Sequence, residues 1–168
     1  MGGDMRTRTA FVIAEGVLAA IVGHLTITLF LAIGDLVTGK GLLYTPRLLA
    51  RVILEGPPAG CVSPDGTTLL LAYSSIHMIV LMLFGLLGSL LITISEQRPV
   101  LWFGGLLLFI MVAWHLAAGV LLAFGPAREC VSLWWVVWAS FAGAIGMGWY
   151  LWRAHPALQA GLRTDRYA

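Results

Sequence analysis

The stretch AFVIAEGVLAAIVGHLTITLFLAIG, from Ala10 to Gly34, decides the class of fold, because Glu15 is its only charged residue. As a helix, this stretch is long enough to cross a hydrocarbon core of about 30 Å, and a helix satisfies its own backbone groups in lipid. Arg6 and Arg8 precede it as in a signal peptide. The apolar run is longer than a typical h-region of about 7–15 residues and no A-x-A-like site follows, so we expect a retained span.

Three further apolar stretches follow, and each is also long enough to cross a bilayer. They run from Thr67 to Ile94, from Val100 to Phe124 and from Val131 to Trp152. Only 11% of the 168 residues are charged, against about 25% in a soluble domain, so lipid is the expected solvent. We therefore predict an all-α membrane fold, an up-down bundle of four transmembrane helices that forms a single domain over residues 1–168.

The distribution of lysine and arginine predicts the orientation of this bundle. One side carries Arg6, Arg8, Arg98, Arg153, Arg163 and Arg166. The other side carries Lys40, Arg47, Arg51 and Arg128. Because cytoplasmic loops are enriched in positive residues, we expect both termini in the cytoplasm and the bundle in a bacterial inner membrane. The net charge of +2, without a basic run, argues against nucleic acid as a partner.

The long loop after the first span contains a predicted amphipathic helix over residues 46–55. Thr45 followed by Pro46 is typical of a helix start with an N-cap, and Gly56 before two prolines is typical of a stop. The polar face of this helix carries Arg47, Arg51 and Glu55. We expect the helix to lie flat at the outer membrane surface, where it carries the chain between two spans; a lid or a docking surface is the alternative.

The only two cysteines, Cys61 and Cys130, fall in the two outer loops. On the oxidising side of a bacterial membrane, two cysteines permit one pairing, so we predict a disulfide between them. The alternative is a pair of unrelated free thiols. Neither cysteine belongs to a C-x-x-C motif, so a redox-active role is unsupported.

His24, His77 and His115 each stand 11 positions from a landmark at the outer end of their span. The landmarks are Asp35, Gly66 and Pro126, respectively. A rise of about 1.5 Å per residue places all three rings roughly 16 Å deep, near the bilayer midplane. Small or polar residues share their helix faces, so we expect the three side chains to point into the bundle as one layer.

Three interpretations of this layer stay open. In the first, which we favour, each imidazole hydrogen-bonds a carbonyl or hydroxyl group of a neighbouring helix. In the second, two of the three histidines bind haem b, or the layer holds a chlorophyll-type pigment. In the third, all three bind one zinc or copper ion. No acidic residue lies at the same depth to support such an ion, so we predict no metal site.

Glu15 is the one carboxylate inside the first span. Carboxylates in that position often take part in proton relays. Without a chain of partners in the sequence, we instead expect Glu15 to reach the inner interface or to pair with Arg8.

No catalytic motif accompanies these residues: the chain has no phosphate loop, no G-x-S-x-G, no C-x-x-C-H and no H-E-x-x-H. The sequence therefore predicts no catalytic residue, and an enzyme is the less favoured class. We expect a non-catalytic accessory subunit of a larger membrane assembly, in electron transport or photosynthesis, whose partners are the lipid bilayer and other membrane subunits. The alternative is a b-type haem-binding membrane redox protein that uses two of His24, His77 and His115.

Overall fold

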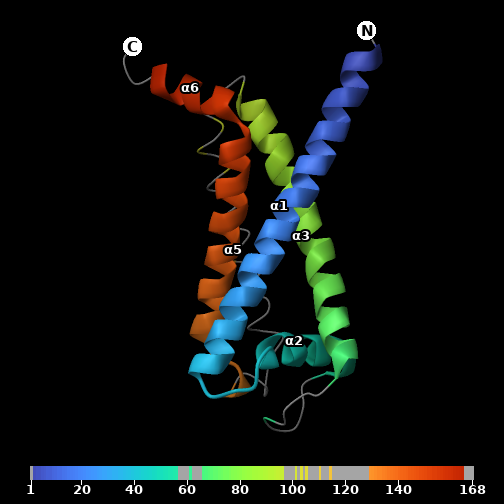
Figure 1. The fold of residues 1–168 in the computed structure, drawn as a ribbon, viewed down its shortest axis with the longest axis vertical. Helices are drawn as coiled ribbons and strands as arrows, with labels where there is room; N and C mark the ends of the chain where they lie inside the picture. The colour runs from blue at the N-terminus through green and yellow to red at the C-terminus, as the bar shows by residue number, and fades with distance from the viewer. Residues whose placement is uncertain are drawn as a thin grey trace.

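The computed structural model describes the backbone of residues 2–56, 61, 66–96, 101, 103, 105, 110, 114 and 129–164. The side-chain surroundings are described for the same positions except 2–8, 133 and 161–164. Every regular element within these ranges is a helix (Figure 1). The expectation of an all-helical chain is therefore confirmed for the part that is described.

Two helices match the strongest apolar stretches of the sequence. Helix α1 spans Gly2–Val37 and helix α3 spans Thr67–Ser95. Within them, Thr9–Val37 and Thr67–Ser95 are each 29 residues long and apolar enough to cross a membrane. A third long helix, α5, covers Leu133–Ala154 where the sequence predicts the fourth span. The predicted third span, residues 100–124, lies almost entirely outside the described residues.

Helix α1 is the central element, because it packs along both α3 and α5 (Figure 1). Glycines set the closest approaches. A Cβ atom added to Gly85 would lie 2.1 Å from the carbonyl oxygen of Gly16, and one added to Gly143 would lie 2.4 Å from the Ile27 side chain. Small residues of this kind let helix backbones approach in lipid, where the hydrophobic effect gives helices little reason to associate.

Helix α2, Tyr44–Glu55, lies across one end of the fold, near the outer ends of α1 and α3 (Figure 1). The predicted helix over residues 46–55 is confirmed, and Gly56 ends it with a φ of 88°. The predicted start is wrong: the helix begins at Tyr44, and Thr45 is not its N-cap. Instead, the Asp35 carboxylate accepts bonds from the Thr45 N–H (2.8 Å) and hydroxyl (2.5 Å). A carboxylate from α1 thus satisfies a free N–H group in the first turn of α2.

The sequence places Leu48, Leu49, Val52 and Ile53 on the apolar face of α2, and the structure confirms this except for Ile53, which is 60% exposed. Leu48, Leu49 and Val52 are buried against the bundle. On the other face, Arg51 Nε lies 3.0 Å from a carboxylate oxygen of Glu55. Arg47 reaches back, and its guanidinium donates to the Leu42 carbonyl over 3.4 Å. The polar residues therefore hold one another at the surface, and the apolar face fixes the helix to the spans.

At the same end, Cys61 is joined to Cys130, and their Cα atoms lie 5.1 Å apart. The bond ties the chain that follows α2 to the segment just before α5. Lys40 supports this junction, because its ammonium group donates to the Cys130 carbonyl over 2.6 Å. The opposite end carries both termini and helix α6, Pro156–Thr164, which turns away from α5 after His155 (Figure 1).

Breaking the disulfide should destabilise the protein. For a sequence separation of 69, loop-closure entropy corresponds to about 4 kcal/mol. We expect Cys130→Ser and Cys61→Ser to lower the free energy of unfolding by a similar amount. The double variant should lose no more than either single one, because both remove the same bond. Unfolding in detergent with and without reductant measures this. Two alkylatable thiols in freshly isolated wild-type membranes would contradict the pairing.

Candidate functional site

Polar side chains of α1 meet partners from other helices at three levels along the fold. Asp35 binds α2 at the outer end, as described above. His24 lies near the middle, where α1 faces α3. Glu15 lies toward the end that carries the termini. The middle and inner levels are the candidate sites, because they combine buried groups that can accept and donate protons.

The middle level brings together two of the three histidines singled out by the sequence. His24 Nδ1 lies 3.3 Å from His77 Nδ1, so one ring donates a hydrogen bond and the other accepts it. Tyr73 packs on this pair, with its ring centroid 4.9 Å from that of His77. His115 lies outside the described residues. The hydroxyls of Tyr73 and Thr28 face each other nearby without a hydrogen bond of good geometry.

The direct contact of the two rings bears on what this level could hold. Two axial ligands of one haem must have the flat macrocycle between them. With their nitrogens 3.3 Å apart, His24 and His77 leave no room for it, so they do not fit as an axial pair. Among the described residues, no three His, Cys, Asp or Glu side chains are grouped to hold a metal ion. The contact is an interhelical hydrogen bond, but its partner is a second imidazole and not the carbonyl or hydroxyl group that the favoured interpretation expects.

The inner level is a cluster of four side chains, Glu15, Ser89, Glu96 and His155, which we call the inner cluster. Glu15 comes from α1, and its side chain is 3% exposed. Ser89 lies on α3, and its hydroxyl donates to Glu15 Oε2 over 2.5 Å. Glu96 directly follows α3, and its side chain is 33% exposed. His155 occupies the turn between α5 and α6 and is buried.

His155 connects the two carboxylates of the inner cluster. Its Nδ1 lies 2.8 Å from Glu96 Oε1. Its Nε2 lies 2.9 Å from Glu15 Oε1 and 3.0 Å from Oε2, so both oxygens share that nitrogen. Both ring nitrogens can donate only in the charged form. Burial lowers the pKa of His155, but the hydrogen bonds and charges of Glu96 and Glu15 outweigh it and raise that pKa above its ordinary value.

The sequence interpretation missed this cluster. It expected Glu15 to reach the inner interface or to pair with Arg8, whose side chain lies outside the described residues. The carboxylate is buried and bonded to Ser89 and His155, which lie 74 and 140 positions away. The predicted topology contained a signal for this cluster. Glu96 and His155 stand at the inner ends of predicted spans, the same side as Glu15, so an up-down bundle places all three at one end. His155 was overlooked because it lies just beyond the apolar stretch.

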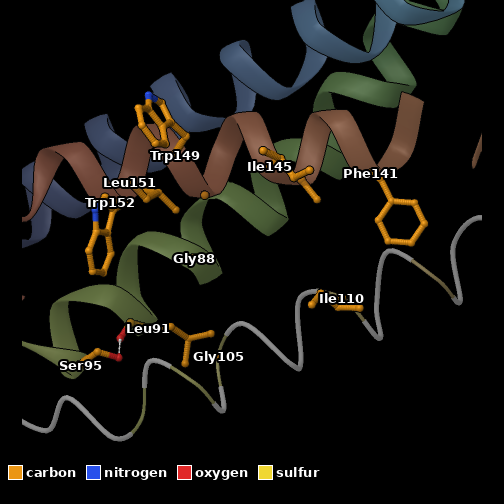
Figure 2. A pocket seen from close by; sticks show the side chains of 12 residues that line it. Gly88, Leu91, Ser95, Gly105, Ile110, Phe141, Ile145, Trp149, Leu151 and Trp152 are labelled. Carbon is orange, nitrogen blue, oxygen red and sulfur yellow. Dashed lines mark hydrogen bonds between the residues drawn. The ribbon is translucent and has the colours of Figure 1, made fainter. Parts of the chain in front are cut away.

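An apolar groove of about 500 Å³ lies between α3 and α5 (Figure 2). Figure 2 shows Leu91 and Ser95 on one wall and Ile145 and Trp149 on α5. The Ser95 hydroxyl donates to the Leu91 carbonyl over 2.7 Å, so its polarity is already used. The groove therefore suits an apolar chain or an apolar helix face.

Comparison of the chain with protein-family models, with curated proteins and with solved structures finds no match.

The raised pKa of His155 predicts a pH-dependent stability. A group whose pKa is raised on folding stabilises the protein fully below its unfolded pKa of about 6.5, and that contribution is lost as the pH rises through the folded value. We expect the melting temperature of the wild type to fall across this interval. His155→Gln should flatten the profile, whereas Glu55→Gln, at an exposed carboxylate of α2, should leave its slope unchanged. Thermal unfolding at a series of pH values measures this dependence. If the melting temperatures of the wild type and His155→Gln change in parallel with pH, the raised pKa is not that of His155.

Proposed function

We propose that the protein is a four-span integral membrane protein with both termini in the cytoplasm, and that it serves as a non-catalytic accessory subunit of a larger membrane assembly. The membrane part of this proposal is supported by the surfaces of α1 and α3. Large apolar side chains such as Leu25, Leu29, Leu71 and Leu83 are exposed along both helices. A water-soluble protein rarely exposes apolar surface of this extent, whereas lipid solvates it.

The course of the chain supports four crossings. Helix α3 ends at Ser95, near the end of the fold that carries α6 (Figure 1). Helix α5 begins at Leu133, near the opposite end that carries α2 (Figure 1). The chain therefore has to return between these two residues, and that interval contains the predicted span 100–124. An even number of crossings is consistent with the two termini lying at one end.

The observation that carries the accessory role is a row of exposed aromatic and apolar residues on α5. We call it the α5 outer face, and it consists of Trp134, Trp138, Ile145 and Trp149. Their spacing of 4, 7 and 4 positions places them on one side of the helix. Trp134 is 72% exposed and Trp138 is 57% exposed. Tryptophan is enriched where protein surfaces bind each other tightly, because it buries a large rigid area.

The apolar groove lies beside the α5 outer face and shares two residues with it. Ile145 and Trp149 belong both to the α5 outer face and to the groove wall (Figure 2). Gly105 and Ile110 of the predicted third span also line the groove, so the α5 outer face is the surface that we assign to a membrane helix of another subunit. Inside the fold, the side chains of Asp35, His24 and Glu15 are hydrogen-bonded to other helices of the same chain.

The orientation is tested with reporter fusions in the bacterial membrane. A reporter placed after Gly39 should lie on the periplasmic side, and one placed after Tyr167 on the cytoplasmic side. Cytoplasmic activity after Gly39, or the same side for both fusions, would contradict the arrangement.

The partner surface is tested by photocrosslinking in native membranes. A photoreactive phenylalanine derivative at position 138 should form a protein adduct of discrete mass. The same derivative at position 83 of α3, where Leu83 is about as exposed as Trp138, should give lipid adducts only. Trp138→Ala should weaken association about 30-fold, because losing a central tryptophan costs about 2 kcal/mol or more. It should leave the melting temperature unchanged. Lipid adducts alone at both positions would contradict the accessory role.

A further inference from the structure

The inner cluster forms a continuous line of hydrogen bonds from the surface into the first span. The outermost member, Glu96, is accessible to water. Its carboxylate meets His155 Nδ1 at 2.8 Å, and His155 Nε2 meets Glu15 at 2.9 Å. The Ser89 hydroxyl closes the line by donating to Glu15 Oε2, the oxygen that also lies 3.0 Å from His155 Nε2. Each of these contacts is short enough for a proton to move between neighbours without a rearrangement of the backbone.

Within the part of the chain that the structure describes, the charges of the inner cluster do not balance. Two carboxylates and one imidazolium sum to one net negative charge. Among the side chains that the structure describes, no lysine or arginine forms an ion pair with the cluster. Arg153, on the adjoining turn of α5, lies over the Trp149 ring instead, 4.9 Å from its centroid. The amide of Gln159 on α6 donates to the Trp152 carbonyl.

The negative charge of the buried Glu15 carboxylate is costly in apolar surroundings when His155 is neutral, and a proton on the carboxylate removes it. Glu15 is the member best placed to keep that proton. It is the most deeply buried of the two carboxylates, and Ser89 can reorient its hydroxyl to accept from it. Glu96, in contrast, is solvated and exchanges freely with the aqueous phase.

We propose that Glu96, His155 and Glu15 form a proton-uptake site, in which a proton from the aqueous phase beside α6 reaches Glu15 through the imidazole of His155. In the transfer step, Nδ1 of the neutral imidazole, whose own proton is on Nε2, takes the proton that Glu96 received from water, and the carboxylate of Glu96 is restored. The Nε2–H bond then breaks and that proton passes to Glu15, which leaves His155 with its proton on Nδ1. No electron is transferred. The net change is one proton moved from water to Glu15.

The site stores a proton and does not conduct it across the bundle. Toward the middle of the fold, the next buried residues of α1 are Ala19 and Ala20, both fully buried. Gly85 of α3 packs against the backbone of this same segment. These residues offer no side chain that could accept a proton before His24. Liposomes that contain the protein should therefore show no proton leak above that of empty liposomes.

The test uses the full-length protein in lipid nanodiscs. Infrared difference spectra across a pH jump should show the C=O stretching band of a protonated carboxylic acid in the wild type. Glu15→Gln should remove that band and reduce proton uptake by about one per molecule. Glu55→Gln, which changes an exposed carboxylate on α2, is the matched control and should change neither. A band that persists in Glu15→Gln, or a wild type without it at every pH at which the protein is folded, would overturn the proposal.

The route through His155 is tested by rate. His155→Gln keeps a hydrogen-bonding side chain but cannot carry a proton from one side to the other. The band should then appear roughly a hundredfold more slowly after the pH jump, the lower end of what a positioned proton-transfer group contributes. If this variant does not fold, the same measurement on Glu96→Gln replaces it, because that side chain is partly solvated. An unchanged rate in the variant measured would overturn the relay.

Discussion

In the membrane setting that we propose, lipid offers no hydrogen-bond partner, so the ionisable side chains that α1 carries into the fold must find partners on other parts of the chain. Glu15, His24 and Asp35 do so with three different elements. The junction of α5 and α6 serves Glu15, α3 serves His24, and α2 serves Asp35. Apolar packing alone would let α1 slide or rotate against its neighbours at little cost. Polar pairs at three levels fix its depth and its rotation together.

The glycines and the polar pairs depend on each other. Gly16 and Gly85 meet where α1 crosses α3, one residue from Glu15 and four from Ser89. A longer side chain at this crossing would separate the two backbones, and the bond from Ser89 to Glu15 would be lost with it. The close approach therefore serves the chemistry of the inner cluster as well as the packing. This coupling explains why the inner polar groups lie beside the tightest contact between helices.

The sequence predicts what depends on local patterns. Apolar length predicts α1 and α3, Gly56 predicts the end of α2, and two cysteines in outer loops permit one pair. The partners of Glu15 are different, because they come from distant parts of the chain and depend on how the helices cross. Asp35 served in the sequence only as a depth marker, since nothing near it indicates that its carboxylate binds Thr45. Hydropathy predicts the depth of each residue along the membrane normal. The pairing of side chains also depends on how each helix is rotated about its axis, and a single sequence does not reveal that rotation.

The bond between Cys61 and Cys130 also bears on how the chain is made. In the proposed orientation, Cys61 emerges on the oxidising side 69 residues before Cys130 has been synthesised. Until then it is an unpaired thiol, open to mixed disulfides with other exported chains. Closure requires that everything up to the start of α5 has been delivered to the membrane. The covalent link therefore separates fully inserted molecules from stalled ones, and a stalled chain keeps a reactive thiol that quality-control enzymes can recognise.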